Sequence, residues 1–178
     1  MAISADDFTL RARRLRWLLC DVDGVLTDGR ILYGASGEPM ASFDIKDGLA
    51  LKIAQKAGLR VGLISGRASQ AVAARAAELG LDAAVLGRLD KGRALDELLA
   101  SHGAVESDVA FIGDDLPDLA PLRRCGLAFA PNDAVAEVLA EVHWPLTRPG
   151  GHGAVREAVE LILRARGDWP RIVASYFA

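Results

Sequence analysis

Short apolar segments alternate with longer segments of helical composition along most of the chain, and this alternation restricts the fold more than any other feature. Five apolar segments of four or five residues predict strands at 17–20, 60–64, 82–86, 108–112 and 126–130. Helical patterns fill most of the intervals, and further helices are predicted at 4–14 and 154–166. This order is typical of an α/β fold, a Rossmann-like parallel sheet covered by helices on both faces. We predict a single domain over residues 1–178.

One insertion interrupts the alternation after the first strand. Residues 29–45 contain two short extended runs around a turn at Gly34–Glu38, which predicts a β-hairpin. No insertion is long enough to form a cap domain. Because an isolated hairpin is marginal in water, we expect it to pack on a partner subunit. The tail, residues 167–178, carries Trp169, Tyr176 and Phe177, and we expect it to reach a neighbouring subunit.

The composition restricts which binding partners and which cellular compartment we expect for this protein. The net charge of −3 gives no electrostatic argument for binding to nucleic acid or to an anionic membrane. Cys20 and Cys125 have no metal-binding spacing, and we interpret both as buried thiols in a reducing compartment. Neither a signal peptide nor an apolar run of membrane-spanning length is evident. We therefore expect a cytoplasmic protein.

Carboxylates follow two of the predicted strands directly. Asp21 and Asp23 come after the first strand and point to the same side of an extended chain, before Gly24 lets the backbone turn. Asp114, Asp115 and Asp118 follow the fourth strand. Repulsion between clustered carboxylates favours a bound cation, and oxygen ligands suit Mg²⁺. We therefore predict a magnesium site where these strands end.

Two further positions supply groups that hold a phosphate. Ser65 follows the second strand, so its hydroxyl and nearby backbone amides can bind phosphate oxygens, while Lys91 can neutralise charge. Each also has an ordinary interpretation, Ser65-Gly66 as a helix cap and Lys91 as a surface residue. Asp115 and Asp118 can likewise serve only a helix dipole. The loop 150–153 is either a hinge or a helix-start anion site, and we treat His102 and His143 as structural.

The order of four motifs identifies a family. The segments DVDGVLTDG, LISGR, LDK and GDDLPD resemble the sequential motifs of the haloacid dehalogenase-like superfamily, and the hairpin, FDIKDG and GGHGAVRE are similar to its capless 3-deoxy-D-manno-octulosonate 8-phosphate phosphatases. The resemblance implies a phosphomonoesterase that forms an aspartyl-phosphate, uses Mg²⁺, takes part in lipopolysaccharide precursor synthesis and assembles as a homotetramer with shared active sites.

The resemblance also implies residue roles. Asp21 would be the nucleophile and Asp23 the acid/base, with Ser65 and Lys91 on the phosphoryl group. Asp21, Asp114 and the Asp23 carbonyl would hold Mg²⁺, and Asp115 and Asp118 would support it. The remaining substrate contacts would come from Thr27, Lys46, Gly48, Gly66 and Arg67.

One departure from the family pattern keeps a second substrate open. Lys46 stands where the family has arginine, and a lysine cannot reproduce a bidentate guanidinium contact. A nine-carbon ulosonate 9-phosphate is therefore the alternative substrate. A non-catalytic phosphoacceptor domain is an alternative of another class, although it has less use for Asp23. A phosphomutase would need a lid to exclude water, for which the chain has no segment.

Overall fold

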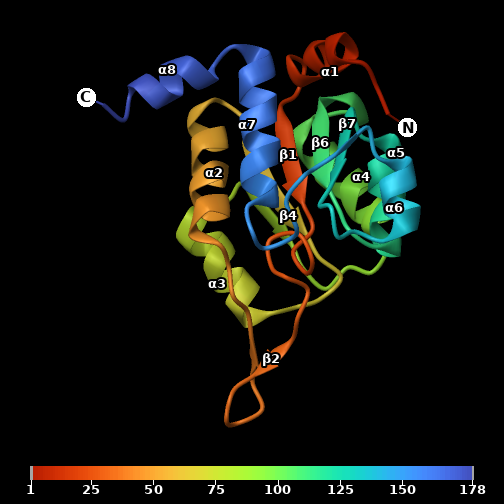
Figure 1. The fold of residues 1–178 in the computed structure, drawn as a ribbon. Coiled ribbons are helices and arrows are strands. Elements are labelled where there is room, and N and C mark those ends of the chain that lie inside the picture. Colours follow the sequence, from red (N-terminus) through yellow and green to blue (C-terminus); the bar gives the residue numbers. More distant parts are fainter. Residues whose placement is uncertain (1, 178) are drawn as a thin grey trace.

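The computed structural model describes residues 2–177 and confirms the α/β prediction. Figure 1 shows a parallel sheet between two layers of helices. Its strand order is β5-β4-β1-β6-β7-β8, with parallel pairing between all neighbours. The strands are β1 (Trp17–Cys20), β4 (Arg60–Ile64), β5 (Ala83–Val85), β6 (Val109–Ile112), β7 (Leu127–Ala130) and β8 (Trp144–Pro145).

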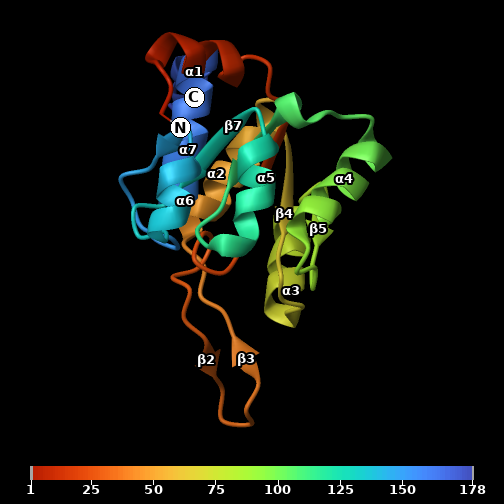
Figure 2. The ribbon, with the colours of Figure 1, turned by 90° about the vertical axis from the view of Figure 1, so that its right-hand side faces the viewer.

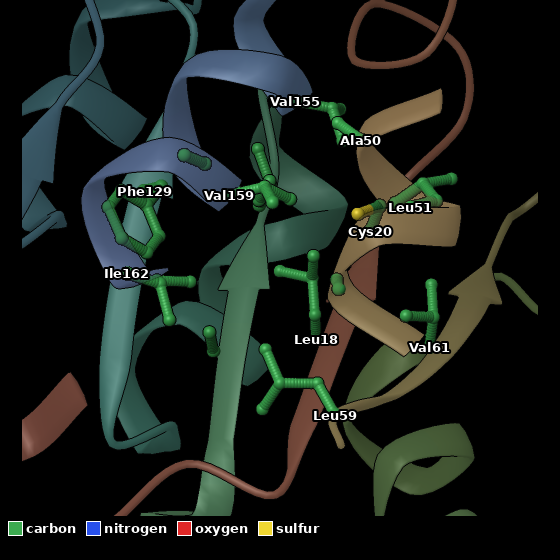
Figure 3. Packing of buried hydrophobic residues seen from close by; sticks show 14 of the residues in the cluster. Leu18, Cys20, Ala50, Leu51, Leu59, Val61, Phe129, Val155, Val159 and Ile162 are labelled. Atoms are coloured by element: carbon green, nitrogen blue, oxygen red, sulfur yellow. The ribbon is translucent and has the colours of Figure 1, made fainter. Parts of the chain in front are cut away.

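The two faces of the sheet carry separate hydrophobic cores. Successive residues of a strand point to opposite faces, so Leu18 and Cys20 enter one core while Trp17 and Leu19 enter the other. Figure 3 shows the first core, where α2 and α7 pack over β1. The first core is covered by α1 (Ala5–Ala12), α2 (Ile45–Lys56), α3 (Gln70–Leu79) and α7 (Ala154–Arg166), and the second by α4 (Lys91–His102), α5 (Leu119–Arg124) and α6 (Ala136–Glu141).

The predicted hairpin is present between β1 and α2. Its strands, β2 (Leu32–Tyr33) and β3 (Pro39–Met40), form a separate two-stranded sheet. Figures 1 and 2 show it projecting well away from the rest of the molecule. The side chains of Leu32, Tyr33 and Met40 are about half exposed or more. The hairpin therefore presents apolar side chains that its own chain does not cover.

The N-terminal helix and the third helix differ from the sequence prediction. Ser4 caps α1, because its hydroxyl accepts a hydrogen bond from the Asp7 amide. The helix ends at Ala12, before the predicted limit at residue 14, and its Phe8 is buried with the ring packed against Phe129 and Trp144. The predicted helix after the SGR motif begins only at Gln70, because Ser69 is its N-cap.

Two elements near the C-terminus were not predicted. The strand β8 has only two residues and includes a proline, so its sequence lacks a recognisable strand pattern. The tail forms a short helix, α8 (Trp169–Ala174). Trp169 is buried against its own chain, with the guanidinium groups of Arg156 and Arg164 5.2 and 5.4 Å from its ring. Most of the described tail beyond Trp169 is exposed, including Val173, Tyr176 and Phe177.

The structure also shows the surroundings of the two cysteines and of two histidines, and whether any helix could span a membrane. Cys20 and Cys125 are free and buried, as predicted. The His143 ring accepts a hydrogen bond from the Ala128 amide, and the His102 ring packs on Trp17, so both have structural contacts. Between residues 2 and 177, no helix combines the length and the apolar character that crossing a membrane requires.

Candidate active site

The predicted site residues converge at the carboxyl edge of the sheet. The central strand β1 pairs with β4 on one side and with β6 on the other, so the chain changes direction across the sheet at this point. Ligands bind beyond the strand ends at such a switch point. An open crevice lies there, and among its lining residues are Asp21, Asp23, Gly66, Arg67, Lys91, Asp114, Asp115 and Asp118.

The turn after β1 is held by its own hydrogen bonds. The Thr27 hydroxyl donates to the Val22 carbonyl at 3.3 Å and accepts from the amides of Gly24 and Gly29 at 3.4 and 3.3 Å. Thr27 is buried, so the structure places this predicted substrate contact inside the turn. Gly24 has φ +84°, and a methyl group added to it would lie 2.1 Å from Asp114 Oδ2. Glycine is therefore required at position 24.

Lys91 joins the two strand ends from α4. Asp90 caps this helix by accepting a hydrogen bond from the Arg93 amide. The Lys91 side chain is only 4% exposed, so the surface interpretation is wrong. Its Nζ lies 2.9 Å from Asp21 Oδ1 and 2.6 Å from Asp118 Oδ1. A buried cation is stable only beside such partners, which fixes Lys91 in the crevice.

Asp118 lies closer to the centre than its predicted supporting role implies. It is fully buried, and besides Lys91 its carboxylate accepts hydrogen bonds from the amides of Asp114 and Asp115 at 3.1 and 3.4 Å. One oxygen each of Asp21, Asp114 and Asp118 lie within 4.8 Å of one another. Asp115 is exposed and accepts a hydrogen bond from the Leu116 amide, so it shapes the turn after β6.

Burial and mutual repulsion perturb the titration of this cluster. Burial, together with the charge of Asp118, raises the pKa of Asp21 to about 6, although Lys91 acts in the opposite direction. Burial and the charges of Asp21 and Asp118 raise the pKa of Asp114 to about 8. Burial acts to lower the pKa of Lys91, but the carboxylates of Asp118 and Asp21 outweigh it and the pKa is raised. The single positive charge of Lys91 is therefore not enough to balance the negative charges of Asp21, Asp114 and Asp118.

A divalent cation fits this deficit. Asp114 Oδ1 is buried and has no hydrogen-bond partner in the described part of the chain. Buried polar atoms rarely stay unpaired, and an orphaned carboxylate oxygen beside two further carboxylates is typical of a site for a hard cation. The donor set is oxygen only, which suits Mg²⁺. Asp23 lies outside the close cluster of carboxylate oxygens, so its predicted contribution is limited to its main-chain carbonyl.

The SGR motif forms the opposite side of the crevice. Ser65 follows β4 and is buried, and its hydroxyl accepts a hydrogen bond from the Arg67 amide at 3.2 Å. Gly66 and Arg67 line the crevice, with Arg67 Nε 3.8 Å from Asp23 Oδ2. Because α3 begins only at Gln70, the amides of this loop precede the helix. The Gly66 amide, which also lines the crevice, can donate to a ligand there without the helix terminus itself.

Two predicted substrate contacts lie outside the crevice of this chain. Lys46 is exposed in the first turn of α2 and lines a separate hollow with Arg148 and Arg156. Gly48 is buried in the same helix, and a methyl group added to it would lie 2.2 Å from a guanidinium nitrogen of Arg75. Within one chain, neither residue borders the carboxylate cluster.

The loop 150–153 is neither of the alternatives considered for it. Gly150 and Gly151 pack against the turn that carries Asp23, and the Gly151 amide donates to the Val25 carbonyl at 2.9 Å. The amides at the start of α7 are bonded to the buried carboxylate of Asp47. The loop is therefore a packing element and leaves no open anion site. Sequence reasoning missed Asp47, because a single acid in a helix's first turn gives no signal of a distant partner.

Comparison with known proteins identifies relatives of this chain. No family model matches the chain. The chain is 40% identical over 157 residues to the 3-deoxy-D-manno-octulosonate 8-phosphate phosphatase of Haemophilus influenzae, covering 88% of this chain and 87% of that protein. A structure of the same phosphatase from Moraxella catarrhalis, in complex with magnesium ion, phosphate ion and KDO, matches with a TM-score of 0.94 and 35% identity over 97% of this chain and 99% of that one.

A third relative connects the chain to the wider superfamily. The structure of a haloacid dehalogenase superfamily hydrolase, subfamily III A, from Legionella pneumophila matches with a TM-score of 0.92 and 36% identity. This match covers 97% of the present chain and 94% of the other. The chain therefore belongs to the 3-deoxy-D-manno-octulosonate 8-phosphate phosphatases of the haloacid dehalogenase-like superfamily.

Proposed function

We propose that this chain is a magnesium-dependent phosphomonoesterase that releases phosphate from 3-deoxy-D-manno-octulosonate 8-phosphate, in the synthesis of lipopolysaccharide precursors. The observation that carries this proposal is the close grouping of Asp21, Asp114, Asp118 and Lys91 at one strand edge. Relatives with 35–40% identity over about 90% of the chain carry this activity in their names. An acidic cluster with one buried lysine suits transfer of a phosphoryl group.

The mechanism begins at Asp21. Its free carboxylate oxygen attacks phosphorus, and the bond from phosphorus to the sugar oxygen breaks as the aspartyl-phosphate forms. Asp23, which is partly exposed at the mouth of the crevice, gives its proton to the departing alcohol. Asp23 then takes a proton from a water molecule that attacks phosphorus. The bond between phosphorus and the Asp21 oxygen breaks, which regenerates the Asp21 carboxylate and releases inorganic phosphate.

Other residues hold the phosphoryl group during these steps. Lys91 keeps Asp21 ionised and oriented, and its ammonium group neutralises charge on the phosphoryl oxygens. The Ser65 hydroxyl and the Gly66 amide bind the remaining oxygens. Asp21, Asp114 and the Asp23 carbonyl would hold Mg²⁺, which supplies positive charge to the phosphoryl group when bound.

A panel of sugar phosphates assayed for phosphate release with Mg²⁺ tests the proposal. We expect turnover of the eight-carbon ulosonate phosphate in the wild type, none after chelation of Mg²⁺, and none in Asp21→Asn. Wild-type turnover by Asp21→Asn would refute the covalent mechanism. A wild-type protein that accepts phosphate once without turnover would instead support the phosphoacceptor alternative.

A nine-carbon ulosonate 9-phosphate remains the second candidate substrate. The observation that favours it is Lys46, an exposed single-point cation at the position of the family's arginine. The same panel compares the two substrates directly, and a higher kcat/KM for the nine-carbon compound would select it. Lys46→Arg should then shift the preference toward the eight-carbon substrate.

We further propose a homotetramer in which the hairpins pack together and complete neighbouring active sites, in the cytoplasm. The exposed side chains of Leu32, Tyr33 and Met40 support the assembly, because a hairpin of this size is not stable alone. Light scattering should give four times the chain mass, and a monomer would refute this role. Truncation of the chain before Tyr176 should alter KM or kcat if the exposed side chains of Tyr176 and Phe177 reach a neighbour; unchanged constants would refute that contact.

A further inference from the structure

Asp47 is a fully buried carboxylate that lies outside the crevice. It occupies the first turn of α2 and forms no ion pair with any other residue between 2 and 177. Its oxygens accept hydrogen bonds from the amides of Gly153 at 3.1 Å and Arg156 at 2.7 Å. A buried charge is costly unless donors surround it, and a helix N-terminus offers both donors and a positive dipole end.

Helix α7 depends on this carboxylate for its N-terminal cap. Its own N-cap residue is Gly153, which has no side chain to accept a hydrogen bond and adopts φ +98°. Asp47 supplies from α2 the acceptor that a serine or aspartate provides in most helices. The position of the α7 N-terminus is thereby fixed relative to α2.

The loop that leads into α7 packs directly against the turn after β1, so the position of the α7 N-terminus restricts the position of that turn. The Gly151 amide donates to the Val25 carbonyl at 2.9 Å. A methyl group at Gly150 would lie 1.8 Å from the Gly24 carbonyl oxygen, and one at Gly151 would lie 2.5 Å from the Thr27 carbonyl carbon. Backbone therefore touches backbone, with no side chain between them to absorb a shift.

The same turn abuts the carboxylate cluster. Gly24 leaves no room for even a methyl group against Asp114 Oδ2, and Asp23 precedes it directly. A displacement of this turn changes the distance between Asp23 and the phosphoryl site, and misplacement by about 1 Å can cost about 100-fold in rate. The chain of contacts from Asp47 thus ends at the acid/base.

We propose that Asp47 is a positioning residue for the turn that carries Asp23, acting through the N-terminus of α7 and the Gly150–Gly151 loop. The proposal rests on the function proposed above, because it assigns the acid/base role to Asp23. Asp47 does not touch the substrate site, so its removal should lower kcat and leave KM nearly unchanged.

The test compares Asp47→Asn with Gly150→Ala and Ser4→Ala. The asparagine amide nitrogen cannot accept a hydrogen bond, so one amide of α7 loses its acceptor. Gly150→Ala pushes on the same turn without changing Asp47. Ser4→Ala removes a helix cap far from the crevice and serves as the control. Steady-state kinetics give kcat and KM, and amide hydrogen exchange by NMR reports on the Thr27, Gly151 and Leu19 amides.

We expect Asp47→Asn and Gly150→Ala each to lose about 10- to 100-fold in kcat with KM within about threefold of wild type. Exchange of the Thr27 and Gly151 amides should be at least about tenfold faster in Asp47→Asn, while Leu19 in β1 stays protected. Ser4→Ala should keep wild-type kcat. An unchanged kcat in either Asp47→Asn or Gly150→Ala would overturn the proposal. So would Thr27 and Gly151 amides that exchange in Asp47→Asn as in wild type, or a Leu19 amide whose exchange is accelerated as much as theirs. If the wild type hydrolyses no sugar phosphate, the proposed function fails, and exchange alone decides whether Asp47 positions the turn.

Discussion

Replacement of Lys91 by methionine tests how the buried charges of the crevice are balanced. Lys91 lies 2.9 Å from Asp21 and 2.6 Å from Asp118, and its side chain is 4% exposed. Removal of one partner from a buried ion pair costs about 3–5 kcal/mol, because the remaining charges stay buried. In a chain of this size about 1 kcal/mol shifts the melting temperature by about 2–4 °C. We therefore expect Lys91→Met to melt about 6–20 °C below wild type at pH 8.5 without metal.

The loss should depend on pH in a defined direction. Lys91 acts to lower the pKa values of Asp21 and Asp118, so its removal raises both further. Above the ordinary pKa of an aspartate, the folded protein then binds more protons than the unfolded chain, and the free energy of unfolding falls as pH rises through the raised pKa. At pH 5 the carboxyls of the variant stay protonated, so the difference from wild type should be smaller.

Differential scanning calorimetry at pH 5 and 8.5 in a chelating buffer measures both effects. Lys56→Met is the matched control, because Lys56 is exposed and has no ion pair within the described chain. The control should melt close to wild type at both pH values. We also expect Lys91→Met to lose about 100- to 1,000-fold in kcat, as for removal of one group that stabilises charge in the transition state. A variant that melts with wild type at pH 8.5, or loses the same amount at both pH values, would refute this account.

Two further predictions concern the turn and the metal. Gly24→Ala should weaken both Mg²⁺ binding and phosphate release, because Gly24 has φ +84° and the added methyl group would lie 2.1 Å from Asp114 Oδ2. Calorimetric titration with Mg²⁺ measures the affinity, and a wild-type affinity in the variant would contradict this crowding. Mg²⁺ affinity of the wild type should fall as pH is lowered from 8 to 6, because protons compete for Asp114, with a pKa of about 8, and Asp21, with a pKa of about 6. Binding near pH 7 should therefore release protons, detectable as a heat that depends on the buffer; a pH-independent affinity would contradict the raised pKa values.

Local sequence patterns were sufficient for most elements of the fold. The strand at 60–64 and the helix at 154–166 have the predicted bounds, because both are encoded by composition within a few residues of each position. The convergence of Asp21 and Asp114 was also predictable, since the carboxyl ends of parallel strands meet at one edge. The two-residue strand β8 and the tail helix α8 lacked such patterns, and their placement depends on packing against the finished sheet and α7.

The sequence alone determined which chemical groups stand at the strand ends, because their order along the chain and the strand pattern are local properties. Only the tertiary structure decided how those groups are paired. Whether Lys91 is exposed or bonded to Asp118, 27 positions away, depends on how α4 packs beside the turn after β6. In the same way, Asp47 meets the start of α7, 106 positions away, only because two helices lie side by side over β1. Contacts of this kind depend on the packing of whole elements, which no local pattern contains.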